Sequence, residues 1–330
     1  MKRRQWMVNM GAAGLAAGLP GWVAAQPVAP AASAVPSSAL QLVVPVPPGG
    51  SVDLTARLLA EHLPRLINQP VVVENRPGAS GSIAAASVAR APGDPNQLML
   101  VFDSFVTNPL IYPQASYGQR DFTPISRLLS FPLVFAVPAT LPVNNVQEFI
   151  ALARKKPGAL NVSSAGLGTL NHLSAELFKA RTGTHIVHIP YRGGVPALQA
   201  VMNDEAQLFL GSWVAIGPHV KSGRIKALAV TSARRYAVAP DLPTLAEAGV
   251  PDFDVSTWIG AVAPARIAPE RRQALHGALM QAMSGSAVRQ TLAQQGLEWV
   301  GSSGTEFETF IAQETRRWTD LVAQQKLTFG

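Results

Sequence analysis

The chain has 330 residues, of which 48% are hydrophobic; it carries 27 basic against 20 acidic residues and no cysteine. Without cysteine it can form no disulfide framework, thiolate metal site, cysteine nucleophile or lipidated cysteine anchor. The net charge of +7 is dispersed and includes no run of five like charges, which gives little basis for nucleic-acid binding. This length and composition allow two domains of ordinary size.

Residues 1–34 predict an export signal and short leader. Lys2, Arg3 and Arg4 precede an uncharged stretch of small and apolar residues at 7–25, which contains four glycines and one proline. This pattern favours a cleaved signal over a membrane span. Small residues at 23–25 and 32–34 offer two cleavage sites, and the paired arginines leave both the Sec and the twin-arginine routes open. We therefore expect a soluble, periplasmic mature protein.

From residue 40 onward, strand-like and helix-like segments alternate. Short β-branched runs predict strands, and apolar residues at spacings of three and four predict helices. The expected strands cover 40–46, 71–73, 97–102, 125–137, 160–163, 186–189, 206–210 and 228–231. The expected helices cover 52–63, 82–91, 146–155, 170–178, 196–202, 269–283, 287–295 and 305–325, with a loop rich in small residues before the strand at 228–231. Such alternation predicts mainly parallel sheets in an α/β protein.

Two glycine-rich turns each link a predicted strand to a predicted helix. Residues 45–53 read PVPPGGSVD, and residues 163–172 read SSAGLGTLNH. A junction of this kind leaves the first helical N–H groups unpaired at the positive end of the helix dipole, so it can bind an anion without a basic side chain. Two such turns, facing each other across a cleft, would hold a small acid from both ends.

Each of these residues also has a purely structural interpretation. Gly49 and Gly50 suit a turn that needs positive φ. Asp53 complements a helix dipole, and Thr169 suits an N-cap. His172 beside Leu173 is more typical of a packed histidine than of a ligand contact. The sequence alone leaves these alternatives open.

Catalytic and cofactor motifs give no support to an enzyme. The chain has no Gly-x-Ser-x-Gly elbow, no P-loop lysine, and no third glycine after Gly166 and Gly168 to complete a dinucleotide fingerprint. His185 and His188, three apart on a predicted strand, would point to opposite faces and make a poor metal pair. We expect no catalysis, no cofactor and no metal.

The strings VPVPPGGSVD at 44–53 and VVVENRPGASG at 71–81 resemble the Bug/TctC family of extracytoplasmic solute-binding receptors, which are associated with tripartite tricarboxylate transporters. Further similar strings lie at 163–173, 188–198, 224–231 and 243–249. The resemblance implies a type II periplasmic-binding-protein fold, an α/β architecture of two domains joined by two crossover strands with the ligand cleft between them. The crossovers are expected near Ser130 and Trp258, so that domain 1 spans 38–129 plus 259–330 and domain 2 spans 130–258.

By the same resemblance, the function is capture of a small organic acid, by closure of the cleft, for membrane transporter subunits. A periplasmic sensor of the same fold that reports to a signalling partner is the alternative. The receptor is expected to be monomeric, without nucleic-acid partners. The expected ligand-binding residues are Pro47, Gly49, Gly50, Ser51, Asp53, Ser104, Ser164, Gly166, Gly168, Thr169, His172 and Ser212.

Some side chains have more particular expected roles. The resemblance favours Asp53 as a group that orients an ordered water or a loop amide near the ligand. Arg76 is expected to be a structural tie, and Arg192 to be solvated outside the pocket. Val46 stands where the family usually has an aromatic residue, a change that widens the expected pocket mouth. Residues 93–99 and 200–204 also depart from the family pattern and should alter packing and turns. Dicarboxylates, acidic amino acids and aromatic carboxylates all remain possible ligands.

Overall fold

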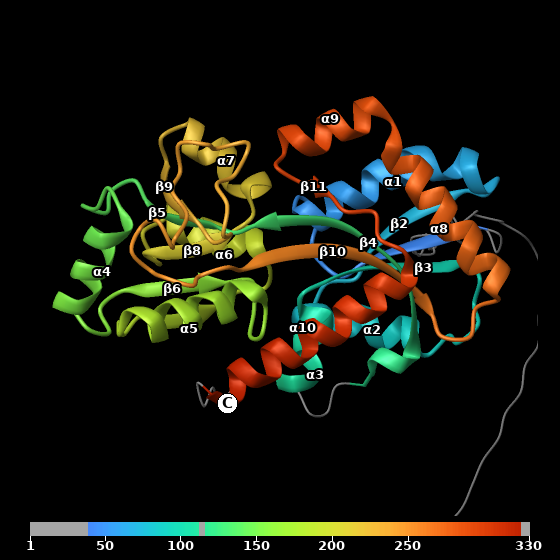
Figure 1. Ribbon diagram of the computed structural model, residues 1–330, viewed down its shortest axis with the longest axis horizontal. Helices are drawn as coiled ribbons and strands as arrows, with labels where there is room; N and C mark the ends of the chain where they lie inside the picture. Colours follow the sequence, from blue (N-terminus) through green and yellow to red (C-terminus); the bar gives the residue numbers. More distant parts are fainter. Residues whose placement is uncertain (1–38, 112–115, 325–330) are drawn as a thin grey trace, which may run out of the picture. The chain divides into compact units, whose positions relative to one another are not determined.

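The polypeptide builds two β-sheets, and the strands of the first come from both ends of the chain (Figure 1). The computed structural model describes residues 39–111 and 116–324, so the predicted export signal lies outside it. The first sheet has the order β11-β4-β10-β3-β1-β2. Its strands are β1 (Leu40–Val44), β2 (Val71–Asn75), β3 (Gln97–Phe102), β4 (Phe122–Pro132), β10 (Ser256–Pro264) and β11 (Glu298–Trp299).

The second sheet has the order β7-β6-β8-β5-β9. Its strands are β5 (Val134–Pro138), β6 (Asn161–Ser164), β7 (Val187–Pro190), β8 (Leu208–Gly211) and β9 (Ile225–Val230). Both sheets are mixed. In the first, β1 runs parallel to β2 and β3, whereas β10 is antiparallel to β3 and β4; in the second, β6 runs parallel to β7 and β8, whereas β5 is antiparallel to β8 and β9. The expectation of mainly parallel sheets is therefore wrong, because the strands next to each crossing of the chain run against their neighbours.

Helices cover both sheets. Those associated with the first sheet are α1 (Ser51–Ile67), α2 (Ser82–Ala89), α3 (Ser104–Ile111), α8 (Pro269–Ser284), α9 (Ser286–Gln294) and α10 (Gly304–Gln324). Those associated with the second are α4 (Val146–Lys155), α5 (Leu170–Thr182), α6 (Gly194–Met202) and α7 (Trp213–Lys221). Short 3₁₀ turns lie at η1 (Ala79–Gly81) and η2 (Gln119–Asp121).

Alternate residues of the central strands enter two different apolar clusters. Leu42 and Leu100 pack into the cluster that contains residues of α1 and α8, and Val43 and Val101 pack into the cluster that contains residues of α2 and α10. Because successive side chains of a strand point to opposite faces, the first sheet is covered on both sides. This explains why its central strands read as continuous apolar runs.

The chain passes from one sheet to the other twice. Leu133 alone separates β4 from β5, and residues 231–255 lead from β9 back to β10. Ser130 and Trp258, the positions expected for the crossovers, are register partners in the β4–β10 pair. The buried hydroxyl of Thr231 accepts the Leu133 amide at 2.9 Å and donates to the Val255 carbonyl at 2.7 Å, so one side chain ties both crossing segments together.

Most predicted elements are confirmed, several of them to within a residue or two, and the exceptions have physical reasons. Pro132 ends β4, so the segment expected as one strand at 125–137 is two strands in two sheets. The segment expected as a loop rich in small residues contains α7, whose Gly217 and Pro218 are poor helix formers. Burial of Ile216 and close packing of Gly217 on the Trp213 ring stabilise this helix despite its composition.

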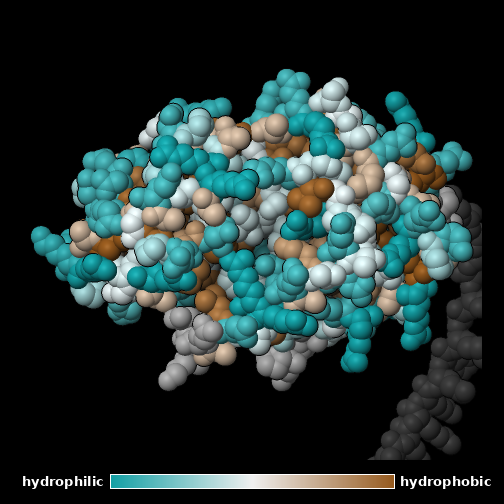
Figure 2. Space-filling view, viewed as in Figure 1, coloured by the Kyte–Doolittle hydropathy of each residue, from teal (hydrophilic) through white to brown (hydrophobic). Residues whose placement is uncertain are grey.

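The surface in view is predominantly polar. Figure 2 shows hydrophilic residues spread over this face, with small, separate hydrophobic patches between them. Within residues 39–111 and 116–324, no helix has the length and apolar character needed to cross a lipid bilayer.

Candidate functional site

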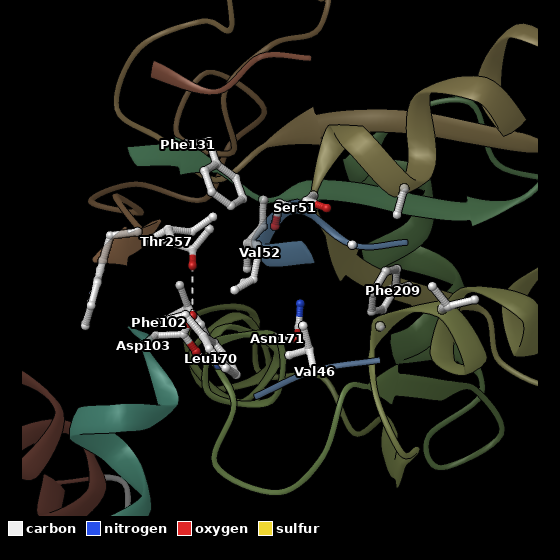
Figure 3. Close-up of a pocket in the computed structure, with 18 of the residues that line it drawn as sticks. Val46, Ser51, Val52, Phe102, Asp103, Phe131, Leu170, Asn171, Phe209 and Thr257 are labelled. Atoms are coloured by element: carbon white, nitrogen blue, oxygen red, sulfur yellow. Dashed lines mark hydrogen bonds between the residues drawn. The ribbon is translucent and has the colours of Figure 1, made fainter. Parts of the chain in front are cut away.

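A small inner cavity of about 120 Å³ lies where elements of both sheets meet (Figure 3). Its volume is close to that of an engineered cavity that binds benzene, so it matches a ligand of about that size. The first turn contributes Pro47, Gly50 and Ser51 to its wall, and Ser212 at the start of α7 contributes from the second sheet. Aromatic and aliphatic side chains form most of the remainder. They include Val46, Val52, Phe102, Phe131, Leu133, Leu170, Phe209 and Ile259.

Asp103, directly after β3, is the ionisable residue in this wall, and its side chain is only 3% exposed. One carboxylate oxygen accepts the hydroxyl of Thr257 at 2.8 Å, and the other accepts the amide of Leu170 at 2.7 Å (Figure 3). Burial raises the pKa of Asp103 to about 6, with a smaller contribution from the charge of Glu314 and an opposing one from the hydrogen bonds of Thr257, Leu170 and the backbone amide of Asp103 itself. Asp103 therefore carries a negative charge at neutral pH and joins β10 to the start of α5.

The first turn presents available backbone donors. Gly50 is the N-cap of α1, and the hydrogen bonds among the described residues give no acceptor to the amides of Ser51 and Val52. Because these groups stand at the positive end of a 17-residue helix, they can bind an anion. The strand, turn and helix lie as the sequence predicts, and anion binding at this turn stays a prediction.

Asp53 braces that turn from inside. Its carboxylate, 3% exposed, accepts the Gly49 amide at 3.0 Å, the Asn75 side-chain amide at 3.0 Å and two bonds from Arg57. Burial raises the pKa of Asp53, but the bonds from Arg57, Asn75 and Gly49 outweigh it and leave the pKa below its ordinary value. Asp53 thus orients a loop amide, and both Asp53 and Gly49 lie behind the wall of the inner cavity.

The second turn is arranged differently, because several of its amides already have partners. Gly166 donates to the Ser164 hydroxyl at 3.2 Å, Gly168 donates to His172 Nδ1 at 3.1 Å, and Leu170 donates to Asp103. The hydroxyl of Thr169, the N-cap of α5, donates to the Gly166 carbonyl at 2.7 Å. The sequence pattern is the same in both turns, but at the inner cavity the first leaves the Ser51 and Val52 amides without an acceptor among the described residues, and the second leaves only that of Asn171.

A wider outer cavity of about 760 Å³ adjoins the inner one. Gly166 and Thr169 line it, together with Pro77, Ser80 and the exposed Arg192. The two cavities share four wall residues, namely Val46, Pro47, Phe102 and Gly194. Val46 therefore stands at the boundary between them, where an aromatic side chain would fill space.

Side-chain hydrogen bonds hold the second turn against the first sheet. Ser80 donates to the Leu167 carbonyl at 2.9 Å, and Thr107 donates to the Gly168 carbonyl at 2.6 Å. A Cβ atom added to Gly166 would lie 2.7 Å from the Ser80 hydroxyl, so this close approach requires glycine. Together with the Asp103–Leu170 bond, these contacts connect the second turn to segments that pack on the first sheet.

Ser164 and His172 form a separate buried cluster behind the second turn. The His188 ring stacks on the His172 ring, and its Nε2 lies 2.6 Å from the Ser164 hydroxyl. Burial lowers the pKa of His172 to about 3, helped by the charges of His188 and Lys179, and burial together with Lys179 lowers the pKa of His188 to about 4. Both rings are neutral at physiological pH. The cluster supports the turn and lines neither cavity.

The expected site residues thus fall into several groups. Pro47, Gly50, Ser51 and Ser212 line the inner cavity, and Pro47, Gly166 and Thr169 line the outer one. Gly49, Asp53, Ser164, Gly168 and His172 support the turns from behind, and Ser104 lines a small separate pocket beside Phe105. Arg76 is confirmed as a structural tie, since it pairs with Glu74 at 2.7 Å. Among the described residues, no cluster of histidines and carboxylates could hold a metal ion.

Sequence reasoning did not find several wall residues. Asp103 directly follows the carboxyl end of a predicted strand, the position at which ligands bind in α/β folds, and Asn171 lies in the first turn of the helix that follows the second glycine-rich turn. Thr257 and the phenylalanines at 131 and 209 carry no local signal. They reach the cavity only because β4, β8 and β10 come together in three dimensions.

Comparison with known proteins places these features in a class. The family described as "Tripartite tricarboxylate transporter family receptor" matches residues 55–327. Protein BugT of Bordetella pertussis is 33% identical over 296 residues, which cover 89% of this chain and 91% of that protein. Among solved structures, Rpa4515 of R. palustris with adipate has a TM-score of 0.85 at 33% identity, covering 89% of this chain and 99% of that one. MatC of Rhodopseudomonas palustris with bound malate has a TM-score of 0.82 at 28% identity, covering 87% and 100% of the two chains.

Two mixed sheets, joined by two crossing segments and enclosing a cavity near helix termini, define a two-domain periplasmic-binding-protein fold. Within that class, the chain belongs to the TctC family of solute-binding receptors.

Proposed function

We propose that this receptor captures a small organic acid in the inner cavity, with one ligand carboxylate bound by the free amides at the start of α1. The observation that carries the proposal is the set of unpaired Ser51 and Val52 amides facing an apolar cavity. Charge-assisted bonds to such amides, in a site shielded from water, give affinity without a basic side chain. The carboxylates bound by two solved relatives, adipate and malate, support this choice of ligand class.

The rest of the function follows from the family. We propose that the chain is exported to the periplasm, that it binds its ligand without converting it, and that it delivers the ligand to membrane subunits of a tripartite tricarboxylate-type transporter. Closure would bend the two crossing segments near Ser130 and Trp258, with the domains as expected from the sequence. The hydrogen-bonded pair of crossings, tied by Thr231, supports a hinge at this place.

Substitutions at Ser51 test the binding mode. Ser51 is the first residue of α1, a position where proline is well tolerated, and the preceding Gly50 already has the extended backbone that a following proline requires. Ser51→Pro therefore removes one amide donor and keeps the helix. Ser51→Ala removes only the hydroxyl and is the matched control.

Calorimetric titration with hexanoate, and with the neutral hexanamide, gives the measurement. We expect the wild type to bind hexanoate and not hexanamide. Ser51→Pro should weaken hexanoate binding at least tenfold, equivalent to about 1.4 kcal/mol, and Ser51→Ala should change it much less. If hexanamide binds as well as hexanoate, or if both variants bind like the wild type, the carboxylate is not held at this helix terminus.

A further inference from the structure

The inner cavity has an unusual distribution of charge for a receptor of organic acids. No lysine, arginine or histidine appears among the described residues of its wall, and Asp103 contributes a negative charge. The positive features at its wall are the starts of α1, α5 and α6, each of which has an amide without an acceptor among the described residues. A second ligand carboxylate would therefore find no cation here.

Asp103 also occupies the place where such a second carboxylate would otherwise bind. The amide of Leu170, the first residue of α5, donates to the Asp103 carboxylate at 2.7 Å. The first amide of α5 is thus already bound by a negatively charged side chain of the protein. A ligand anion would have to displace Asp103, which is buried and also bonded to Thr257.

The Asp103 carboxylate still has acceptor capacity. An ionised carboxylate offers about four lone-pair positions, and Thr257, Leu170 and the backbone amide of Asp103 itself donate to it. Because Asp103 lines the cavity, a remaining position can accept a donor from a ligand. An ammonium or hydroxyl group would satisfy it, whereas a methyl group or a carboxylate would not.

Most of the wall between the two polar ends is apolar. Val52, Phe131 and Phe209 line the cavity, and the side-chain amide of Asn171 also points into it (Figure 3). This arrangement suits a ligand whose middle is largely hydrocarbon, because most polar groups placed there would lose hydration without a partner. The cavity thus presents an amide donor site, an apolar wall and a carboxylate acceptor.

We propose that the inner cavity selects acids with a single carboxylate, an apolar body and a hydrogen-bond-donating group at the other end, and that Asp103 determines this specificity. The ligand class is ω-amino or ω-hydroxy acids in preference to dicarboxylates. The inference rests on the proposed function, because it places the ligand carboxylate at the start of α1. It adds the chemical identity of the ligand group at the opposite end from that carboxylate.

Acids that differ only at their far end test this specificity. At pH 7.5, calorimetry compares hexanoate, 6-hydroxyhexanoate, 6-aminohexanoate and adipate, and then the corresponding four-carbon acids from butanoate to succinate. In whichever of the two chain lengths binds more tightly, the wild type should bind the amino or the hydroxy acid at least tenfold more tightly than the dicarboxylate. Asp103→Asn should weaken the amino acid at least tenfold, strengthen the dicarboxylate, and change the simple acid less than threefold.

Thr257→Val is the matched control. It removes the hydrogen bond from Thr257 to Asp103 and keeps the negative charge, so the preference for the amino acid over the dicarboxylate should survive. Circular dichroism of each variant shows whether the fold is retained, and the Thr257 variant separates loss of charge from local disturbance.

The outcomes separate this inference from the proposed function. If hexanoate depends on the Ser51 amide as expected but the dicarboxylate binds as tightly as the amino and hydroxy acids, the specificity proposal is wrong and the proposed function stands. The same conclusion follows if Asp103→Asn leaves the order of affinities unchanged. If none of the acids binds, both proposals are wrong.

Discussion

The imidazole rings of His172 and His188 stack with their centroids 3.9 Å apart and their planes 15° from parallel. His172 comes from α5 and His188 from β7, so the stack joins a helix to a strand beneath the second turn. Two protonated rings at this distance would repel each other. Protonation of both rings would therefore destabilise the stack.

A first prediction concerns acid stability. The pKa values of His172 and His188 in the folded protein, about 3 and about 4, lie below the unfolded value of 6.5. Below pH 6.5 the unfolded chain binds protons that the folded protein does not, so stability falls as the pH drops. At pH 4.5 each ring should cost about 2 kcal/mol relative to pH 7. Urea unfolding of the wild type and of His188→Gln at both pH values measures this, and an equal loss in the two proteins would contradict it.

Asp103 should have the opposite effect. Its pKa in the folded protein, about 6, lies above the unfolded value of 3.8, so its ionisation destabilises the fold above pH 6 and the penalty disappears as the pH falls towards 3.8. Asparagine can keep both hydrogen bonds if the Thr257 hydroxyl turns to accept. Asp103→Asn should therefore be more stable than the wild type at pH 8, by up to about 3 kcal/mol, and nearly equal to it at pH 4. A variant that is less stable at pH 8 would show that the charge itself is needed.

The Thr231 hydroxyl should contribute more to the free energy of unfolding than the small size of this side chain suggests. Thr231→Val keeps the shape of the side chain but leaves the Leu133 amide and the Val255 carbonyl without their present partner. Unsatisfied buried groups cost about 1–3 kcal/mol each, so the midpoint of chemical denaturation should fall clearly. Thr231→Ser retains the hydroxyl and should lose much less. Equal losses in the two variants would assign the effect to packing.

Val46 should govern access for bulky acids. It lines both the inner and the outer cavity, so Val46→Phe would narrow the boundary between them. Calorimetry should show at least a tenfold loss of affinity for benzoate and a much smaller change for butanoate. Val46→Ile, a smaller enlargement, should fall between the wild type and the phenylalanine variant. An equal loss of affinity for benzoate and butanoate would instead indicate a general disturbance of the first turn.

Much of the fold could be predicted because its elements have strong local signals. The helix at Val146–Lys155 and the strand at Gln97–Phe102 match their periodicity and composition. By contrast, α7 contains glycine and proline, and it is stabilised by contacts that only the tertiary structure supplies. Local pattern cannot reveal such a helix.

The candidate site likewise combines features with a local sequence signal and features that only the tertiary structure supplies. The first turn could be found from its glycines and the helix after it, because a helix terminus is a local feature. The second turn has an equally suggestive sequence, yet Asp103, 67 residues away, accepts its Leu170 amide. Whether a helix terminus is free or already neutralised depends on a distant side chain, and no single-sequence motif encodes that.

The shared hydroxyl of Thr231 has a mechanical consequence. Since both crossing segments are bonded to the same side chain, independent bending of one would break a hydrogen bond of Thr231, and joint bending is favoured. The two halves of the receptor should then move along a single angular coordinate, without independent twisting. One pair of spectroscopic labels, placed on α4 and α9, would then be enough to follow the whole motion through the distance between them. Ligands could be ranked by the angle between the two halves at which each complex is most stable.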